Sequence, residues 1–284
     1  MKPSPLQTIL LTTLTMISFA SNSLLNRLAL GQNTIDAITY TTIRLVTGAI
    51  MLFIIASFQR RNGQTFLRGS WLSAAFLFLY AITFSFAYTR LTTGTGALIL
   101  FGSVQITMLF VALRNGEHPQ PLEWLGLILA LGGLVYLVFP GLSAPSLFGS
   151  TFMMTAGIAW GFYSIRGRGS QNPLADTAGN FLYAVPMILI VRALPINQIH
   201  ITAHGTILAT LSGAFASGVG YVLWYAALRG LTTTRAAIVQ LSVPMIAAWS
   251  GVLLLSEKVS TRLLFAGILI LGGIGLSVLS RGKR

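Results

Sequence analysis

One arginine lies inside a long apolar segment, where charged side chains are rarely found. Arg44 falls within the stretch 35–57, among apolar and hydroxyl-bearing residues. A charge at that depth in a bilayer costs at least about 3 kcal/mol, and such residues are functional by default. A guanidinium there could bind the carboxylate of a substrate. Alternatively, Arg44 snorkels or bonds helix carbonyls, because it lies only about nine residues, or roughly 13 Å, from the predicted outer end of its helix.

Aromatic side chains recur at helical spacing in three other apolar segments. Tyr80, Phe84 and Tyr88 follow one another at i, i+4 and i+8, so they share one helix face. Two further pairs have the spacing i, i+3, namely Trp160 with Tyr163 and Tyr221 with Trp224. Rings near a helix centre could stack on an apolar ligand or pack between helices. Rings near a helix end are more often interfacial, which we expect for Tyr88 and Trp71.

Uncharged amides inside apolar segments could orient the amino and carboxylate groups of a zwitterion. Asn22 and Asn26 are one helical turn apart and share a face. The alternative role is hydrogen bonding between helices, worth about 1 kcal/mol for each bond. The predicted substrate-binding set consists of Asn22, Asn26, Arg44, Tyr80, Phe84, Phe101, Gln105, Trp160, Tyr163, Tyr221, Trp224 and Gln240.

Three residues are candidates for a hinge or a gate. Pro244 lies one turn beyond Gln240 and is expected to kink its helix. Glu117 and Glu257 fall at predicted hairpins, where each could gate a cavity by pairing with a neighbouring base. Each could equally be a helix-terminus charge that fixes its hairpin.

Other kinds of chemistry lack the residues they need. The chain has no cysteine, and its few acidic residues lie at predicted helix ends and hairpins. His200 and His204 are spaced i, i+4 in a predicted loop, but no acid lies near them, so we expect no metal site. No cofactor or catalytic residue is predicted. An intramembrane enzyme would need a Ser/His pair, paired carboxylates or a metal cluster at depth, and a proton relay would need a carboxylate there.

The elements that must position these residues are membrane spans. Charged residues make up 8% of the chain and hydrophobic residues 54%, whereas a soluble domain has about 25% charged residues. Apolar stretches long enough to cross a bilayer recur along all 284 residues. We predict an all-α integral membrane protein with ten spans near 7–26, 35–57, 70–89, 92–112, 122–139, 146–165, 174–194, 206–228, 232–253 and 262–280.

The distribution of positive charge predicts the orientation. Most of the 18 Lys and Arg residues fall in segments on the side of the N-terminus, so both termini are predicted to be cytoplasmic. The net charge of +13 is spread singly or in pairs between apolar runs and forms no stripe, so nucleic acid is not an expected partner. The expected partners are a small-molecule substrate and the lipid bilayer, and no pattern indicates an oligomeric state.

The chain repeats itself after a shift of 140 residues. Leu91-Thr92-Thr93 aligns with Leu231-Thr232-Thr233, Glu117 with Glu257, and Gly132-Gly133 with Gly272-Gly273. We predict two repeats, 1–141 and 142–284, with five spans each. Because five is odd, the second repeat must enter the membrane from the opposite side, an arrangement typical of secondary transporters with a site near the midplane.

These motifs resemble the drug/metabolite transporter superfamily in its ten-span, EamA-like form. The second half carries the pattern most fully, with Pro244, Leu255-Ser256-Glu257-Lys258, Gly267 and Gly272-Gly273. The first half departs from it at Val104, which stands opposite Pro244. Among members of the superfamily, the many aromatic residues in the middle spans look most like those of bacterial aromatic amino acid exporters. The resemblance implies an inner-membrane exporter whose central cavity is lined by spans 1–4 and 6–9, with spans 5 and 10 peripheral.

The sequence therefore predicts a secondary transporter that exports small amphipathic metabolites, with amino acids, and aromatic ones above all, as the favoured substrates. Alternating access through the central cavity is the expected mechanism. An exporter of drugs, lipids or other metabolites remains an alternative, whereas a channel and an intramembrane enzyme are disfavoured. Gly157 and Gly161 have the spacing of a close helix contact. We expect Gly132-Gly133 and Gly272-Gly273 to serve packing in the same way.

Overall fold

The computed structural model describes residues 4–59, 68–114, 121–139, 144–167, 170, 172–194, 199–231, 239–240 and 242–281. Across these residues the regular structure is helical, and the one extended pairing is an isolated bridge between Ile35 and Ile201. The predicted all-α fold is therefore confirmed for the described part of the chain.

Most helices lie close to the predicted spans. Their bounds are α1 Pro5–Gly31, α2 Ala37–Phe58, α3 Trp71–Tyr88, α4 Thr93–Arg114, α5 Pro121–Val138, α6 Leu147–Gly167, α7 Pro173–Ala193, α8 Ala203–Leu211, η1 Ser212–Val219, α9 Gly220–Leu228, α11 Ser242–Leu255 and α12 Thr261–Arg281. The span expected at 206–228 is built by α8, the π-helical segment η1 and α9 in succession. The span expected at 232–253 is described at residues 239–240 and from Ser242 onward, and residues 232–238 and 241 lie outside the described part of the chain. Helix α1 continues to Gly31, so Arg27 is part of this helix and not of the loop in which it was predicted.

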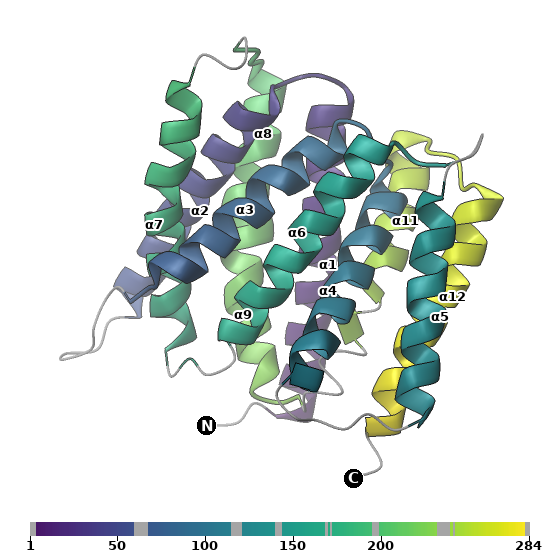
Figure 1. The fold of residues 1–284 in the computed structure, drawn as a ribbon. Helices are drawn as coiled ribbons and strands as arrows, with labels where there is room; N and C mark the ends of the chain where they lie inside the picture. Colours follow the sequence, from purple (N-terminus) through teal and green to yellow (C-terminus); the bar gives the residue numbers. More distant parts are fainter. Residues whose placement is uncertain are drawn as a thin grey trace.

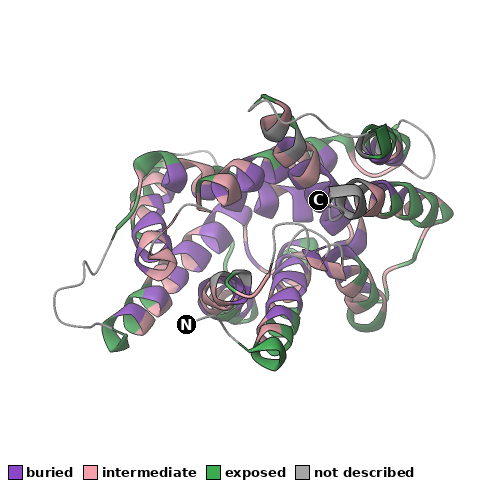
Figure 2. Ribbon diagram, turned by 90° about the horizontal axis from the view of Figure 1, so that it is seen from below, coloured by how far each residue is buried: buried purple, intermediate pink, exposed green. Residues whose placement is uncertain are grey.

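The apolar helices make this a multi-pass membrane protein. Five helical stretches of the described residues are long and apolar enough to cross a bilayer, and shorter apolar segments occur in α4, α5, α11 and α12. Large apolar side chains such as Phe58 and Leu253 are exposed, as expected where lipid replaces water. Figure 2 shows the buried residues gathered on the inward faces of the helices and the exposed ones on the outward faces. The total of ten spans stays a prediction.

The two halves of the chain pack on each other helix by helix. Helix α2 packs on α7, and α5 packs on α12 (Figure 1). Helices α3 and α4 of the first half both contact α6, and their counterparts α9 and α11 both contact α1. Exchanging the halves therefore converts each of these helix pairs into itself or into another. Such a pattern is expected for two related units.

Helices α1 and α6, which open the two halves, run in opposite directions. Near the end of α1, Arg27 Nη1 donates to the Tyr88 carbonyl at 3.2 Å, at the end of α3. Near the end of α6, Arg166 Nε donates to Ser73 Oγ at 3.0 Å, at the start of α3. We refer to the end of the bundle where α1 begins and α12 ends as the terminal end (bottom of Figure 1) and to the other as the opposite end.

Glycines set the closest contacts between helices. A Cβ added at Gly157 would lie 2.6 Å from the Leu100 carbonyl oxygen, and one at Gly161 would lie 3.0 Å from Thr107. Helix α6 thus approaches α4 along Gly157 and Gly161, as their spacing predicted.

The two Gly-Gly pairs behave differently at their two positions. Gly133 and Gly273 set the contact between α5 and α12, at the edge of the bundle (Figure 1). Gly132 and Gly272 face open space, with nothing within 4 Å of an added Cβ. The prediction that both members of each pair serve packing is therefore wrong for the first member.

Candidate transport site

The buried arginine lies on α2, close to α3 of the first half and η1 of the second. Arg44 is 2% exposed. Its Nε donates to Ser217 Oγ at 3.1 Å, and its Nη2 donates to Tyr80 Oη at 3.2 Å. The guanidinium carbon also lies 5.2 Å from the ring centroids of both Tyr80 and Phe84, within range of a cation–π interaction.

Arg44 has no acidic partner among the described residues. The one salt bridge within the described part of the chain joins Arg27 to Glu257. One of the Arg44 donors, Nη1, also makes no hydrogen bond to any described residue. A buried guanidinium is stabilised when all its donors are used and a counter-charge is near. The site therefore offers a fixed positive charge and a spare donor, which suit a carboxylate.

The π-helical segment brings two hydroxyls to this region. In a π-helix the repeat is i to i+5, so Ser212 and Ser217 lie on one face of η1. Gly213 allows η1 to approach α2, because a Cβ there would lie 2.1 Å from Thr47 Oγ1 and 2.3 Å from the Arg44 carbonyl oxygen. This contact puts Ser217 within reach of the Arg44 side chain.

A chain of neutral polar groups extends from the arginine along α1. Asn22 Nδ2 donates to Tyr80 Oη at 3.3 Å, and Ser212 donates to Asn22 Oδ1 at 2.6 Å. Asn26 donates to the Asn22 carbonyl oxygen at 2.8 Å, and Ser85 donates to Asn26 Oδ1 at 3.4 Å. These amides and hydroxyls can accept from an ammonium group as well as donate.

Aromatic rings from four helices enclose the same region. The Trp160 ring lies 4.9 Å from Tyr80 and 5.0 Å from Tyr221, centroid to centroid. Phe19 contacts Trp160, Tyr221 and Trp224 edge-on at 5.9–6.1 Å. Aromatic rings prefer offset or edge-on contacts, so a ligand ring could make the same kind of contact with this cluster.

The space left between these groups is small. A cavity of about 20 Å³ is lined by Phe19, Asn22, Ser23, Tyr80, Phe84, Leu100, Phe101, Trp160 and Tyr221. That volume suits one water, whereas a benzene ring has been accommodated in a cavity of about 150 Å³. Helices must move before an amino acid can enter.

The structure gathers most of the predicted set, but not all of it. Asn22, Tyr80, Phe84, Phe101, Trp160 and Tyr221 line the cavity, while Arg44, Asn26 and Trp224 contact lining residues. Tyr163 stacks near Trp160 at 5.4 Å but lines a different pocket. Gln105 and Gln240 do not line the cavity, nor does Pro244, which is buried in α11.

Sequence reasoning missed Phe19, Ser212 and Ser217. Phe19 could have been found, because it precedes Asn22 by three residues and Asn26 by seven and so shares their helix face. The two serines could not, because an α-helical period does not place residues five apart on one face.

An ion pair joins the two halves at the opposite end of the bundle. Helix α11 ends at Leu255, and Ser256 adopts a left-handed conformation with φ of 53°. This turn brings Glu257 back over the helix end, where Oε1 accepts from Arg27 Nε at 3.1 Å and Oε2 from the Thr93 amide at 2.8 Å. Glu257 thus pairs with a base from the other repeat. Glu117, its counterpart in the first repeat, lies outside the described residues.

Tyr88 lies beside this ion pair and not at the membrane interface where we expected it. Its side chain is fully buried, and its hydroxyl donates to the Thr93 carbonyl at 3.4 Å. Its ring meets Phe84 edge-on at 4.8 Å, which connects the region of the ion pair to the central cavity. Trp71, in contrast, is exposed and stacks on Tyr183.

Two helical halves around a polar and aromatic centre define the class as a membrane transporter. The pattern of the EamA-like transporter family matches residues 6–139 and 147–279, and the chain belongs to this family. An uncharacterised Pseudomonas aeruginosa protein is 48% identical over 97% of this chain and 96% of its own length. A probable amino-acid metabolite efflux pump of Salmonella typhimurium is 29% identical over 72% of this chain and 71% of its own. A crystal structure with 20% identity gives a TM-score of 0.67 over 95% of this chain and 97% of that one, which shows the fold alone.

Proposed function

We propose that the protein exports small amphipathic metabolites, with aromatic amino acids as the favoured substrates. The observation that carries this proposal is the position of Arg44, a buried guanidinium with no acidic partner among the described residues, beside aromatic rings and amides. The named function of the Salmonella relative, an amino-acid metabolite efflux pump, supports the same substrate class.

Each part of an aromatic amino acid has a matching group in the site. The substrate carboxylate binds Arg44, whose spare Nη1 supplies a charge-assisted hydrogen bond. The side-chain oxygens of Asn22 and Ser212 accept hydrogen bonds from the ammonium group. The side-chain ring inserts between Trp160 and Tyr221, where offset or edge-on contacts add about 1 kcal/mol beyond burial.

Transport proceeds by alternating access. The centre is closed in this structure, and the pair between Arg27 and Glu257 closes the opposite end. One half rocks against the other and opens the cavity at one face at a time. The setting we propose is a bacterial inner membrane crossed ten times, with both termini in the cytoplasm and the opposite end facing outward. Flux follows the substrate gradient.

The proposal is tested by uptake of labelled phenylalanine into proteoliposomes, with competition by analogues that each lack one group. We expect saturable uptake that phenylalanine and tryptophan inhibit. Phenethylamine lacks the carboxylate and 3-phenylpropanoate lacks the ammonium group, so both should compete at least 10-fold more weakly.

Either of two results would overturn the substrate class. One is the absence of saturable phenylalanine uptake by protein that is correctly inserted. The other is equal competition by phenethylamine and phenylalanine, since that would mean the carboxylate is not recognised. Transport of an apolar cation in the same vesicles would instead identify a drug exporter.

A further inference from the structure

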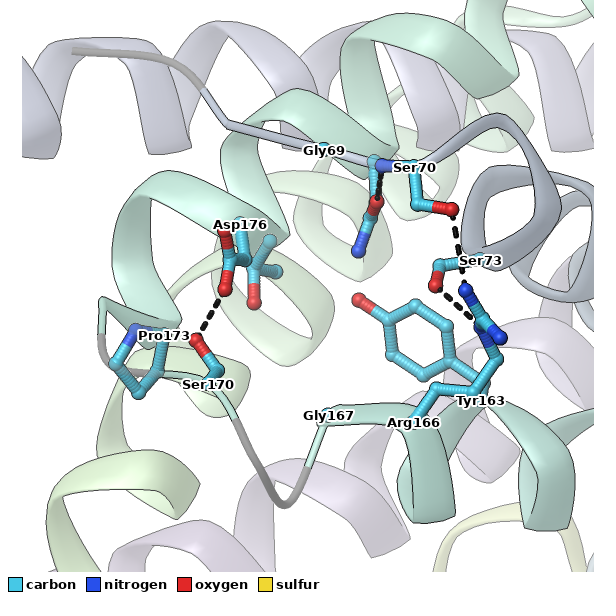
Figure 3. A pocket seen from close by; sticks show the side chains of 11 residues that line it. Gly69, Ser70, Ser73, Tyr163, Arg166, Gly167, Ser170, Pro173 and Asp176 are labelled. Carbon is cyan, nitrogen blue, oxygen red and sulfur yellow. Dashed lines mark hydrogen bonds between the residues drawn. The ribbon is translucent and has the colours of Figure 1, made fainter. Parts of the chain in front are cut away.

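A second pocket lies at the terminal end, between α3, α6 and α7. Its volume is about 180 Å³, much larger than the central cavity. Its wall includes one cation and one anion, Arg166 and Asp176. Figure 3 shows these two side chains on opposite sides of the pocket, with the Tyr163 hydroxyl between them. Tyr163 is the one predicted substrate-binding residue that the structure assigns to this place.

The two charges are held apart by neutral partners. Arg166 Nε donates to Ser73 Oγ at 3.0 Å, and its Nη2 donates to Ser70 Oγ at 3.2 Å. On the other side, the Ser170 hydroxyl donates to the Asp176 carboxylate. The two side chains form no salt bridge with each other or with any other described residue. Each is therefore positioned without being neutralised.

The segment that forms one wall is fixed to α7. The Arg68 amide donates to the Ala175 carbonyl at 3.1 Å, and the Ser70 amide donates to Asn180 Oδ1 at 3.0 Å. Contact at Gly179 is so close that a Cβ there would overlap the Arg68 carbonyl. The wall that carries Ser70 is thus preorganised, which lowers the cost of ordering a site when a ligand binds.

Charges at these helix ends have a simpler explanation that does not account for the whole pocket. A cation in the last turn of α6 and an anion in the first turn of α7 both complement helix dipoles. The helix dipoles do not explain why the Tyr163 hydroxyl faces the pocket. This side chain is 3% exposed and its hydroxyl faces the pocket, with Thr177 and Asn180 beside it but no hydrogen bond of good geometry to any described residue. A polar ligand would complete the hydrogen bonding of this buried hydroxyl.

We propose that this pocket is a second binding site that takes the zwitterionic head group of an α-amino acid before it reaches the central cavity. Arg166 binds the carboxylate, and Asp176 binds the ammonium group. The Tyr163 hydroxyl donates a hydrogen bond to the carboxylate. A lone anion is repelled by Asp176 and a lone cation by Arg166, so only a molecule with both charges satisfies both walls.

The size of the pocket agrees with this ligand. The pocket, at about 180 Å³, exceeds the cavity of about 150 Å³ that holds benzene. Because its polar groups all address the head group, the site selects α-amino acids as a class and leaves the choice of side chain to the central rings. This inference rests on the proposed function for its substrate class.

The test measures the affinity of the full-length protein in detergent for L-alanine by titration calorimetry. Alanine has the head group but no ring to engage the central site. We expect binding by the wild type, weakened at least 10-fold in Arg166→Gln and in Asp176→Asn, and weakened less in Tyr163→Phe. Neither N-acetylalanine nor alaninamide should bind comparably. Arg229→Gln is the matched control, because Arg229 is exposed at the same end of the bundle.

A central-site variant separates this proposal from the proposed function. We expect Trp160→Ala to abolish phenylalanine flux while its affinity for alanine stays within about 2-fold of wild type. The second site is contradicted if alanine does not bind, if Arg166→Gln behaves like Arg229→Gln, or if Trp160→Ala removes alanine binding. Alanine binding without any phenylalanine flux would retain the pocket and reject the proposed transport function.

Discussion

Arg44 is expensive for the fold and useful only if something binds it. Its side chain is almost fully buried, it lacks an acidic partner among the described residues, and it keeps one donor unused. Replacing buried charges by apolar groups of similar size is often neutral or stabilising. The substrate binding that we propose explains why such a residue occupies the centre of the fold.

The first prediction is that Arg44→Met separates stability from activity. The methionine fills similar volume without a charge, so the melting temperature in detergent should stay the same or rise. Phenylalanine flux should fall at least 10-fold, since a charge-assisted hydrogen bond contributes about 1.5–3 kcal/mol. A variant with a lower melting temperature and normal flux would show that Arg44 is structural.

At the scale of elements, sequence periodicity predicted the helices well and their irregularities poorly. The helices α2, α3 and α7 end within two residues of the predicted spans, because apolar length and polar breaks determine where a helix can cross. Two features were not predictable. The extension of α1 past Arg27 accompanies an ion pair with Glu257, which is distant in sequence, and the π-helical turns of η1 lie where Gly213 packs closely on α2.

The candidate site was predictable where one helix face carries it and not where several helices meet. Tyr80 and Phe84 share a face of α3, and both line the cavity. Tyr163 has the same kind of spacing with Trp160, yet the structure places it in the wall of another pocket. The depth of a residue along its helix decides which of two sites it serves, and that depth follows from how the helices cross.

The second prediction concerns the close contact between α4 and α6. Gly157→Leu should impair phenylalanine flux without preventing membrane insertion, because a larger side chain would meet the Leu100 carbonyl and Ser103. Overpacking of this kind costs about 1–3 kcal/mol. Gly132→Leu is the control, since nothing lies within 4 Å of a Cβ at that position. Equal flux in both variants would mean that the contact does not matter for transport.

At the scale of the whole molecule, the halves meet at two ends with different chemistry. At the opposite end, Glu257 pairs with Arg27 and accepts from the Thr93 amide at the start of α4. The terminal end holds the polar pocket between Arg166 and Asp176. In the mechanism that we propose, the ion pair closes the opposite end while the terminal end receives substrate, which is one of the states that alternating access requires.

The third prediction is that breaking this pair opens the opposite end. The chain has no cysteine, so Ser23→Cys places a single thiol in the central cavity. Labelling by an impermeant maleimide from outside intact cells should be faster when Glu257→Gln is added, because the closed state loses a partly buried ion pair. A loss of about 1.4 kcal/mol would give a 10-fold change in the population of the open state.

Two further variants test the origin of this effect. Arg27→Gln should raise the labelling rate similarly, and combining it with Glu257→Gln should add little, because both remove the same interaction. Lys258→Gln removes an exposed charge from the adjacent position and should leave the rate unchanged. An equal increase with Lys258→Gln would show that general electrostatics, and not the pair, governs access.

The central claim is that the Arg44 site among the aromatic rings carries aromatic amino acids across the membrane. Its most direct test is the rate of phenylalanine efflux from proteoliposomes without an imposed ion gradient, for wild type, Trp160→Ala and Trp249→Ala. Trp249 is exposed on α11 and controls for the loss of an indole. Saturable efflux by wild type and Trp249→Ala, lost in Trp160→Ala, is the result we predict. Efflux that is unchanged in Trp160→Ala would contradict the claim.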